Sequence, residues 1–324
     1  MKQHYVPKFY LERFIDGSGK NLIFNREFNE LKEKYPSAIC YQKDYYGADN
    51  TIEEAFSKIE TFVAQKNLLG KLIDKSINSK GKFDLATFIS LQMMRTPFTE
   101  ELLRQQSSFI TTEYIKLRLQ LHLKNPRDYN EYRDDMVKKN KPFLSKKKLG
   151  EFLNDIGDNN VKITPNDNKY YTLGLSAVKD IAIAINELSW TIYKAPRTCQ
   201  FITSDNPVFT LYGMGLQQEG AVTLFALDKK YLLCIINDSS NKNTVVWAGE
   251  GEKKLVCQAN QNIAENSYRY VIAANKRLLA RVVCRTKLSE KEYSADERLV
   301  KTWSLGPYLG AGKVPRETIG KSDI

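Results

Sequence analysis

The sequence predicts an α+β fold: a helical N-terminal half with a short N-terminal hairpin, followed by a mixed half with a small, mostly antiparallel sheet. Two observations lead to this prediction. Apolar residues recur at helical spacing through much of residues 51–156, whereas short β-branched and aromatic strings cluster after residue 188. Because the strands cluster and do not alternate regularly with helices, an α+β arrangement is favoured over a parallel α/β sheet.

The first 28 residues contain many aromatic side chains, so we expect this segment to be ordered. Alternation over residues 5–28 predicts a strand, a turn at Asp16–Lys20 and a returning strand from Asn21. The aspartate and two glycines of the turn string DGSGK supply the backbone conformations that a hairpin connection needs.

Periodicity and capping signals place the remaining elements. Thr51 followed by Glu54 is a plausible capping box for the first long helix. Helices are predicted over 51–73, 84–97, 99–124, 145–156, 173–188 and 252–267, and strands over 189–195, 200–204, 207–211, 222–227, 231–237 and 268–274.

Length and composition indicate a soluble globular protein. With 324 residues, 42% hydrophobic and 27% charged, the chain can form one large domain or two ordinary ones. We expect a hairpin and helical region over 1–160 and an α+β region over 161–324, or one continuous domain. The longest purely apolar runs have five residues, far fewer than the roughly 20 that span a bilayer. We therefore predict a cytoplasmic protein with no membrane partner.

The five cysteines are widely spaced and contain no C-x-x-C pair. This pattern predicts reduced, mostly buried thiols and argues against a disulfide framework or a zinc site. G-x-G-x-x-G, G-x-x-x-x-G-K-[ST], G-x-S-x-G and H-E-x-x-H motifs are also absent from the sequence. Nucleotide-loop kinases, dinucleotide oxidoreductases and α/β-hydrolases are therefore disfavoured.

Positive charge is concentrated in one stretch of the chain. Residues Arg104–Lys148 contain twelve Lys or Arg and five Asp or Glu, which is +7 of the total +11. Such a concentration suits nucleic acid or another polyanion, and the interleaved aromatic residues suit base stacking. The alternative is a solvated helix surface whose aromatic residues make core contacts.

The string FITSDNPV runs from an apolar strand into Ser204, Asp205 and Asn206. Asp and Asn at a strand end bond their own backbone, so a purely structural turn is one interpretation. The functional interpretation is that Asp205 points a carboxylate into a cleft, as a metal ligand or a general base.

Two predicted helices contribute further polar candidates. Glu53 and Glu60 are seven residues apart and share a helix face, and Gln92 and Arg95 share a face of the next helix. The planar guanidinium of Arg95 can bind a phosphate or a carboxylate. The alternative is an inter-helix salt bridge from Arg95 to Glu60 or Glu53.

The two histidines differ in their surroundings. His122 lies among leucines late in a long predicted helix, so we expect a structural or exposed role. His4 precedes an ordered segment, and with Asp205 and a glutamate it could form a magnesium or manganese centre. Alternatively, His4 pins the first strand through a hydrogen bond.

Four strings, QHYVPKFYLERF, FISLQMMRTP, FITSDNPV and NIAENSYRYVIA, occur in this order. Together they resemble the domain-of-unknown-function 4238 family of bacterial proteins, over roughly Lys2 to Ala273. The resemblance implies no settled activity. It implies that these residues match signature positions: Gln3, His4, Pro7, Gln92, Arg95, Ser204, Asp205, Asn206 and Pro207.

We therefore expect the signature residues to form one polar cleft on a protein that acts on a phosphate-bearing ligand such as nucleic acid, by metal-dependent, nuclease-like hydrolysis. His4 would be base or metal ligand, Asp205 a metal ligand and Glu60 an additional catalytic carboxylate, with Mg or Mn as the metal. The substrate-binding residues would be Gln3, Gln92, Arg95, Ser204 and Asn206.

Two alternatives to this catalytic hypothesis remain open. In the first, the protein is a non-catalytic binding or interaction protein whose polar cluster is a structural hydrogen-bond network. In the second, the chain binds nucleic acid without chemistry, through Arg104–Lys148 alone.

Overall fold

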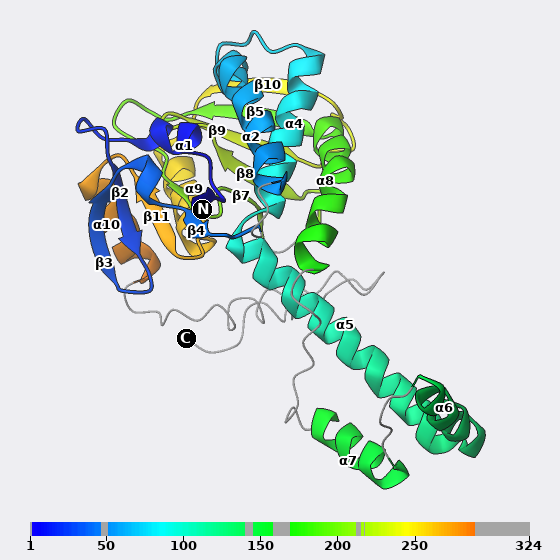
Figure 1. The fold of residues 1–324 in the computed structure, drawn as a ribbon. Helices are drawn as coiled ribbons and strands as arrows, with labels where there is room; N and C mark the ends of the chain where they lie inside the picture. Colours follow the sequence, from blue (N-terminus) through cyan, green and yellow to red (C-terminus); the bar gives the residue numbers. More distant parts are fainter. Residues whose placement is uncertain are drawn as a thin grey trace. The chain divides into compact units, whose positions relative to one another are not determined.

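The computed structural model describes residues 2–46, 51–139, 145–157, 169–211, 215–216 and 218–288. It confirms the α+β class, with three small, mostly antiparallel sheets among these residues (Figure 1). The strands are β1 (Lys2–His4), β2 (Asn21–Asn25), β3 (Glu30–Lys34), β4 (Tyr41–Lys43), β5 (Ser189–Lys194), β6 (Thr203–Ser204), β7 (Val208–Thr210), β8 (Val222–Ala226), β9 (Tyr231–Ile236), β10 (Val245–Glu250) and β11 (Tyr270–Ala273).

The helices lie mainly in the first half of the sequence, as predicted. They are α1 (Lys8–Leu11), α2 (Thr51–Gln65), α3 (Leu68–Ile73), α4 (Ser79–Met94), α5 (Pro97–Lys124), α6 (Pro126–Lys138), α7 (Lys146–Gly157), α8 (Lys169–Glu187), α9 (Lys253–Glu265) and α10 (Lys276–Thr286), with short 3-10 turns at Glu12–Phe14 and Pro36–Ala38. Figure 1 shows α2 and α4 side by side, and their residues are in contact.

The sheets join segments that are far apart in the sequence. One sheet has the order β3-β2-β11-β6, so residues near 22, 203 and 271 are hydrogen-bonded neighbours. The second has the order β10-β5-β9-β8-β7 and is antiparallel except for the β10–β5 pair. Strands β1 and β4 form a separate antiparallel pair.

The described residues fall into two compact units. The first lies within 1–100 and 173–324, and the second within 101–172. The pairing of β2 with β11 explains why the first hundred residues share a unit with the later strands. The regions predicted from the sequence, 1–160 and 161–324, stay a prediction about domains.

The N-terminal segment is ordered, but its local structure differs from the prediction. The hairpin is β2–β3, which turns within residues 26–29, and residues 8–14 are helical where we expected a strand. Tyr10, Leu11 and Phe14 have helical spacing and are fully buried. Burial of this one face determined the local structure, so the apparent alternation was misleading.

The buried face of the N-terminal helix anchors it to the second sheet. The Tyr10 ring stacks on Phe225, and its hydroxyl donates to the Ala226 carbonyl at 2.7 Å. The same hydroxyl lies 2.8 Å from the Thr203 hydroxyl. The segment that starts the chain is therefore a core element.

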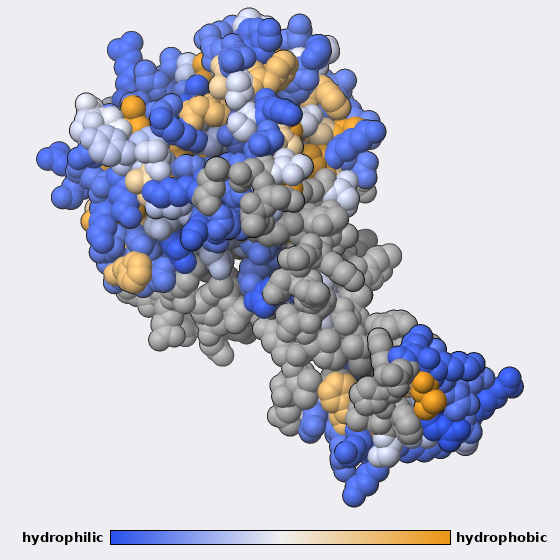
Figure 2. All heavy atoms as spheres, viewed as in Figure 1, coloured by the Kyte–Doolittle hydropathy of each residue, from blue (hydrophilic) through white to orange (hydrophobic). Residues whose placement is uncertain are grey.

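All five cysteines are free thiols. No helix among the described residues is long and apolar enough to cross a membrane. The face seen in Figure 2 is mainly hydrophilic, with smaller hydrophobic areas between the polar residues.

Candidate functional site

Two glutamines from the signature strings fix the N-terminal strand to later segments. Gln3 is buried, and its Oε1 accepts the backbone N–H of Tyr46 at 2.7 Å. Gln92, buried on α4, donates from Nε2 to the Tyr5 carbonyl at 2.8 Å. These bonds use side-chain atoms that were predicted to bind substrate.

Arg95 at the end of α4 is fully buried, with 0% exposure, and forms an ion pair with Glu60 of α2. Its Nε and Nη2 atoms donate to Oε1 of Gln92 at 3.2 and 2.9 Å. The guanidinium also lies over the Phe56 ring, 5.6 Å from its centroid. The inter-helix salt bridge, one of the two interpretations of Arg95, is thus present. We call Gln3, His4, Glu53, Glu60, Gln92 and Arg95 the N-terminal network.

Ser204, Asp205 and Asn206 form a buried turn, which we call the aspartate turn. The two Asp205 carboxylate oxygens accept the backbone N–H groups of Tyr268 at 2.8 Å and Arg269 at 2.6 Å. Ser204 Oγ donates to the Asn206 carbonyl at 2.9 Å and accepts the Asn206 N–H. An Asx-type turn was the structural interpretation of this string, but the Asp205 carboxylate bonds residues 268 and 269, and the local bonds come from Ser204.

Burial raises the pKa of Asp205, and the backbone N–H groups that bond the residue oppose that rise. Two N–H donors stabilise the carboxylate in a site from which water is excluded. Because each oxygen already accepts a hydrogen bond from the chain, the carboxylate is part of the fold of the β6–β11 region.

His4 and Glu53 of the N-terminal network each contain a buried atom without a hydrogen bond. His4 Nε2 and Glu53 Oε2 are buried, and neither has a hydrogen-bond partner among the described residues. Burial lowers the pKa of His4, although a backbone hydrogen bond with Ser37 and the charge of Glu60 oppose the change. Burial raises the pKa of Glu53, and Glu60 raises it further. A neutral imidazole beside carboxylates has the groups that general acid–base chemistry needs.

The aspartate turn meets the end of α4 through Asn206. Its Oδ1 accepts a long, 3.4 Å hydrogen bond from the hydroxyl of Thr96, and its Nδ2 donates to the Asn266 carbonyl at 3.0 Å. Within the described residues, His4 and Asp205 share no hydrogen bond, and no group of three His, Cys, Asp or Glu is placed to hold a metal ion. The described residues therefore do not supply the Mg or Mn ligand set expected from His4, Asp205 and Glu60.

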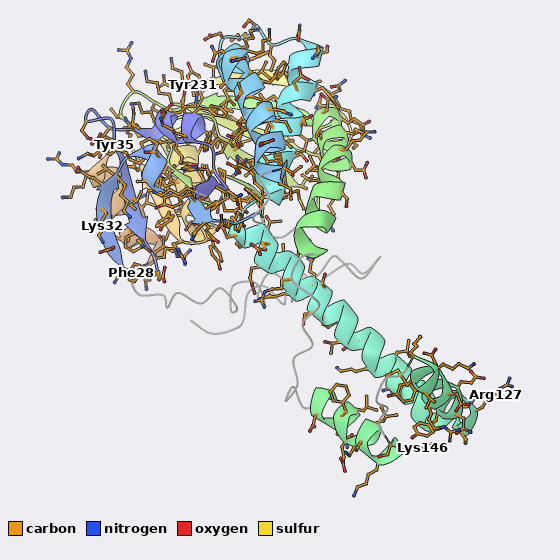
Figure 3. All side chains as sticks on the ribbon, in the orientation of Figure 1. Phe28, Lys32, Tyr35, Arg127, Lys146 and Tyr231 are labelled. Atoms are coloured by element: carbon orange, nitrogen blue, oxygen red, sulfur yellow. The ribbon has the colours of Figure 1, made fainter. Side chains whose placement is uncertain are left out.

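The basic stretch Arg104–Lys148 lies in the second compact unit. Many of its cations lie next to carboxylates, as in the pairs Arg104–Glu101, Lys116–Glu113, Arg127–Glu131, Arg133–Asp134, Lys139–Asp135 and Lys147–Glu151. Figure 3 labels Arg127 and Lys146, and the Lys146 ammonium lies 5.2 Å from the centre of the Tyr129 ring. The side chains of His122, Tyr114 and Phe143 lie outside the described residues. Polyanion binding by this stretch stays a prediction.

Sequence reasoning missed a cavity of about 340 Å³ lined by α9, α10 and residues 197–200. Four arginines line this arginine cavity: Arg197, Arg277, Arg281 and Arg285. The string KRLLARVVCRT contains the pattern that could have indicated this cavity. Its arginines, Arg277, Arg281 and Arg285, follow one another at intervals of four residues and therefore share one helix face. That face is opposite buried Leu279 and Val283.

A comparison with known protein families covers most of the chain. The family model described as Protein of unknown function (DUF4238) matches residues 2–277. The chain belongs to this family. No curated protein and no solved structure matches this chain. The matched residues include the N-terminal network and the aspartate turn, but end before Arg281 and Arg285 of the arginine cavity.

Proposed function

We propose that this DUF4238 protein is a non-catalytic binding protein for a phosphate-bearing ligand, and that its signature residues form a structural hydrogen-bond network. The main observation against a catalytic role is the burial and hydrogen bonding of the Asp205 carboxylate. This carboxylate is fully buried, and each oxygen accepts a backbone N–H. A metal ligand or general base must reach the metal or substrate, and Asp205 is at 0% exposure.

The state of Arg95 supports the same proposal. A phosphate clamp must present its guanidinium fork to the ligand, but this one is at 0% exposure and bonds Glu60 and Gln92. The net charge of +11 and the arginine cavity favour an anionic ligand.

An incubation assay tests this proposal. Single- and double-stranded DNA and RNA would be incubated with the protein in Mg²⁺, Mn²⁺ or EDTA, beside His4→Ala and Asp205→Ala variants. We expect no metal-dependent cleavage, a lower melting temperature for Asp205→Ala, and salt-dependent binding of a phosphate-bearing probe to the wild type. Cleavage that both variants lose while remaining folded would establish an enzyme and overturn the proposal.

The unpartnered atoms of His4 and Glu53 favour a second candidate, hydrolysis of a phosphate ester by general acid–base catalysis without a metal. This candidate predicts cleavage in EDTA that His4→Gln and Glu53→Gln abolish. Asp205→Asn, which retains an acceptor in the aspartate turn, would keep that activity in its folded fraction. Absence of cleavage in EDTA would remove the second candidate.

A further inference from the structure

The arginine cavity combines a concave shape with concentrated positive charge. Its volume of about 340 Å³ is at the lower end of the range for small-molecule sites. Its lining contains four arginines and no aspartate or glutamate. Within the described part of the chain, no ion pair joins any of the four guanidinium groups to a carboxylate.

The spacing of the arginines carries an electrostatic cost. Arg277, Arg281 and Arg285 follow one another at i, i+4 on α10, where neighbouring like charges repel. Asn275, the N-cap of this helix, also lines the cavity, so the positive end of the helix dipole lies beside it. An anion in the cavity would offset both contributions.

The rest of the cavity wall is joined by hydrogen bonds and contains both polar and apolar residues. Asn260 of α9 donates to the Gln200 carbonyl at 2.9 Å and accepts the Ile202 N–H at 3.0 Å, which fixes α9 to the segment before β6. Val256 and Val282 supply apolar surface. The Gln200 Oε1 atom is buried and has no hydrogen-bond partner among the described residues.

We propose that the arginine cavity binds a small phosphate ester of mononucleotide size, with the phosphates on the α10 arginines and the less polar part against the valines. This inference rests on the proposed function and gives that function a site. Guanidinium forks bind phosphate oxygens in a bidentate manner, which matches the arginines. A concave site with apolar surface fits a small ester better than the backbone of a long nucleic acid, which tracks an extended groove.

Calorimetric titration of the full chain tests the site, with inorganic phosphate, pyrophosphate, ADP and a short single-stranded RNA as probes. The test variant is Arg281→Ala, at the middle of the arginine row. The matched control is Arg127→Ala on α6, which removes the same charge from a side chain that is 85% exposed and paired with Glu131. Thermal melts would establish that both variants are folded.

We expect ADP or pyrophosphate to bind the wild type in a saturable manner, Arg281→Ala to weaken that binding at least about tenfold, and Arg127→Ala to leave it unchanged. Tighter binding of ADP than of pyrophosphate would support contact between the valines and the less polar part of the ester. Binding of inorganic phosphate without binding of ADP would contradict that contact. Equal affinity in wild type and Arg281→Ala would overturn the cavity site but leave the proposed function standing. RNA binding that both variants weaken equally would also overturn the cavity site. No binding of any probe would overturn both proposals.

Discussion

The N-terminal network and aspartate turn differ from the arginine cavity in how their polar groups are used. In the first region, Arg95 bonds Glu60 and Gln92, and both Asp205 oxygens accept backbone N–H groups. In the cavity, the contact found for Arg285 among the described residues is a weak one, Nη1 to the Cys257 sulfur at 3.4 Å. The charges of Arg95 and Asp205 are therefore bonded within the protein, whereas the arginines of the cavity are exposed to solvent.

A residue's place in the region that matches the family and its availability to a ligand are separate properties. Polar side chains within a fold are retained at low cost only when they are bonded, because each buried unsatisfied group costs about 1–3 kcal/mol. The residues of the N-terminal network and the aspartate turn meet that condition, apart from one atom each of His4 and Glu53.

The largest effect is expected from Asp205→Ala. Removal of the carboxylate leaves the N–H groups of Tyr268 and Arg269 without their acceptor, which lowers the free energy of unfolding by about 2–6 kcal/mol. Urea titration followed by circular dichroism measures this loss. Asp238→Ala is the control, because the bonds from Ser240 and Asn241 to that carboxylate are exposed, and we expect a much smaller loss. Similar losses in both variants would contradict an architectural role for Asp205.

The next effect concerns the Arg95–Glu60 ion pair. Arg95→Met leaves Glu60 and the Gln92 Oε1 atom without a partner, and we expect a loss of about 2–3 kcal/mol because Glu60, 22% exposed, regains some water. Adding Glu60→Gln should recover part of the loss. The coupling free energy from this double-mutant cycle is the measurement.

The surface pair Arg127–Glu131 on α6 provides a matched cycle. Its side chains are 85% and 66% exposed, so we expect a coupling free energy of about 0.3–0.5 kcal/mol. If the coupling free energy of Arg95 and Glu60 is no larger than this, the buried pair behaves like an exposed surface pair. The difference between the N-terminal network and the arginine cavity would then be weakened.

The sequence was sufficient to predict the fold class and most long helices, because periodicity and capping are local signals. It did not predict β10 or α10. Strand β10 pairs in parallel with β5, a non-local contact, and four of its six residues are exposed. Residues 8–14 were misassigned because aromatic alternation resembles a strand, whereas burial of Tyr10 and Phe14 on one face requires a helix.

The candidate site was predictable only in part for a related reason. Residue types near Gln92 and Arg95 indicated the network and its ion pair with Glu60, and that pair is present. Whether a side chain is satisfied depends on backbone groups brought in by distant strands. The donors to Asp205 come from residues 268 and 269, and no local pattern around FITSDNPV specifies them. Helix α10 was not predicted, so its three cavity arginines were not recognised as candidates.

A smaller, pH-dependent effect is expected at His4. Its pKa is lowered by burial in the folded state, so between pH 6.5 and that lowered value the unfolded chain binds the proton more strongly. The contribution of His4 to stability therefore falls as the pH drops through 6.5. The charged and titratable groups affecting this imidazole are Glu53, Glu60, Arg95 and Lys2.

The His4→Gln variant isolates that contribution. The stability difference between wild type and variant, measured by urea titration, should shrink from about pH 7.5 to about pH 5.5. Glu53→Gln serves as a second background, because it removes the neighbouring carboxylate whose pKa is raised. A difference that is constant with pH, or that grows as the solution becomes acidic, would show that burial does not control this imidazole.

The smallest effect has the opposite sign. Arg281 repels Arg277 and Arg285 across single turns of α10, and each such pair destabilises a helix by about 0.2–0.5 kcal/mol. Arg281→Ala should therefore raise the free energy of unfolding slightly in low salt without ligand, although the same change weakens ligand binding. The gain should vanish in about 1 M NaCl, where the Debye length is about 3 Å. A loss of stability in low salt would mean that Arg281 has a structural partner, as Arg95 does. The arginines of the cavity and of the N-terminal network would then both have a structural role.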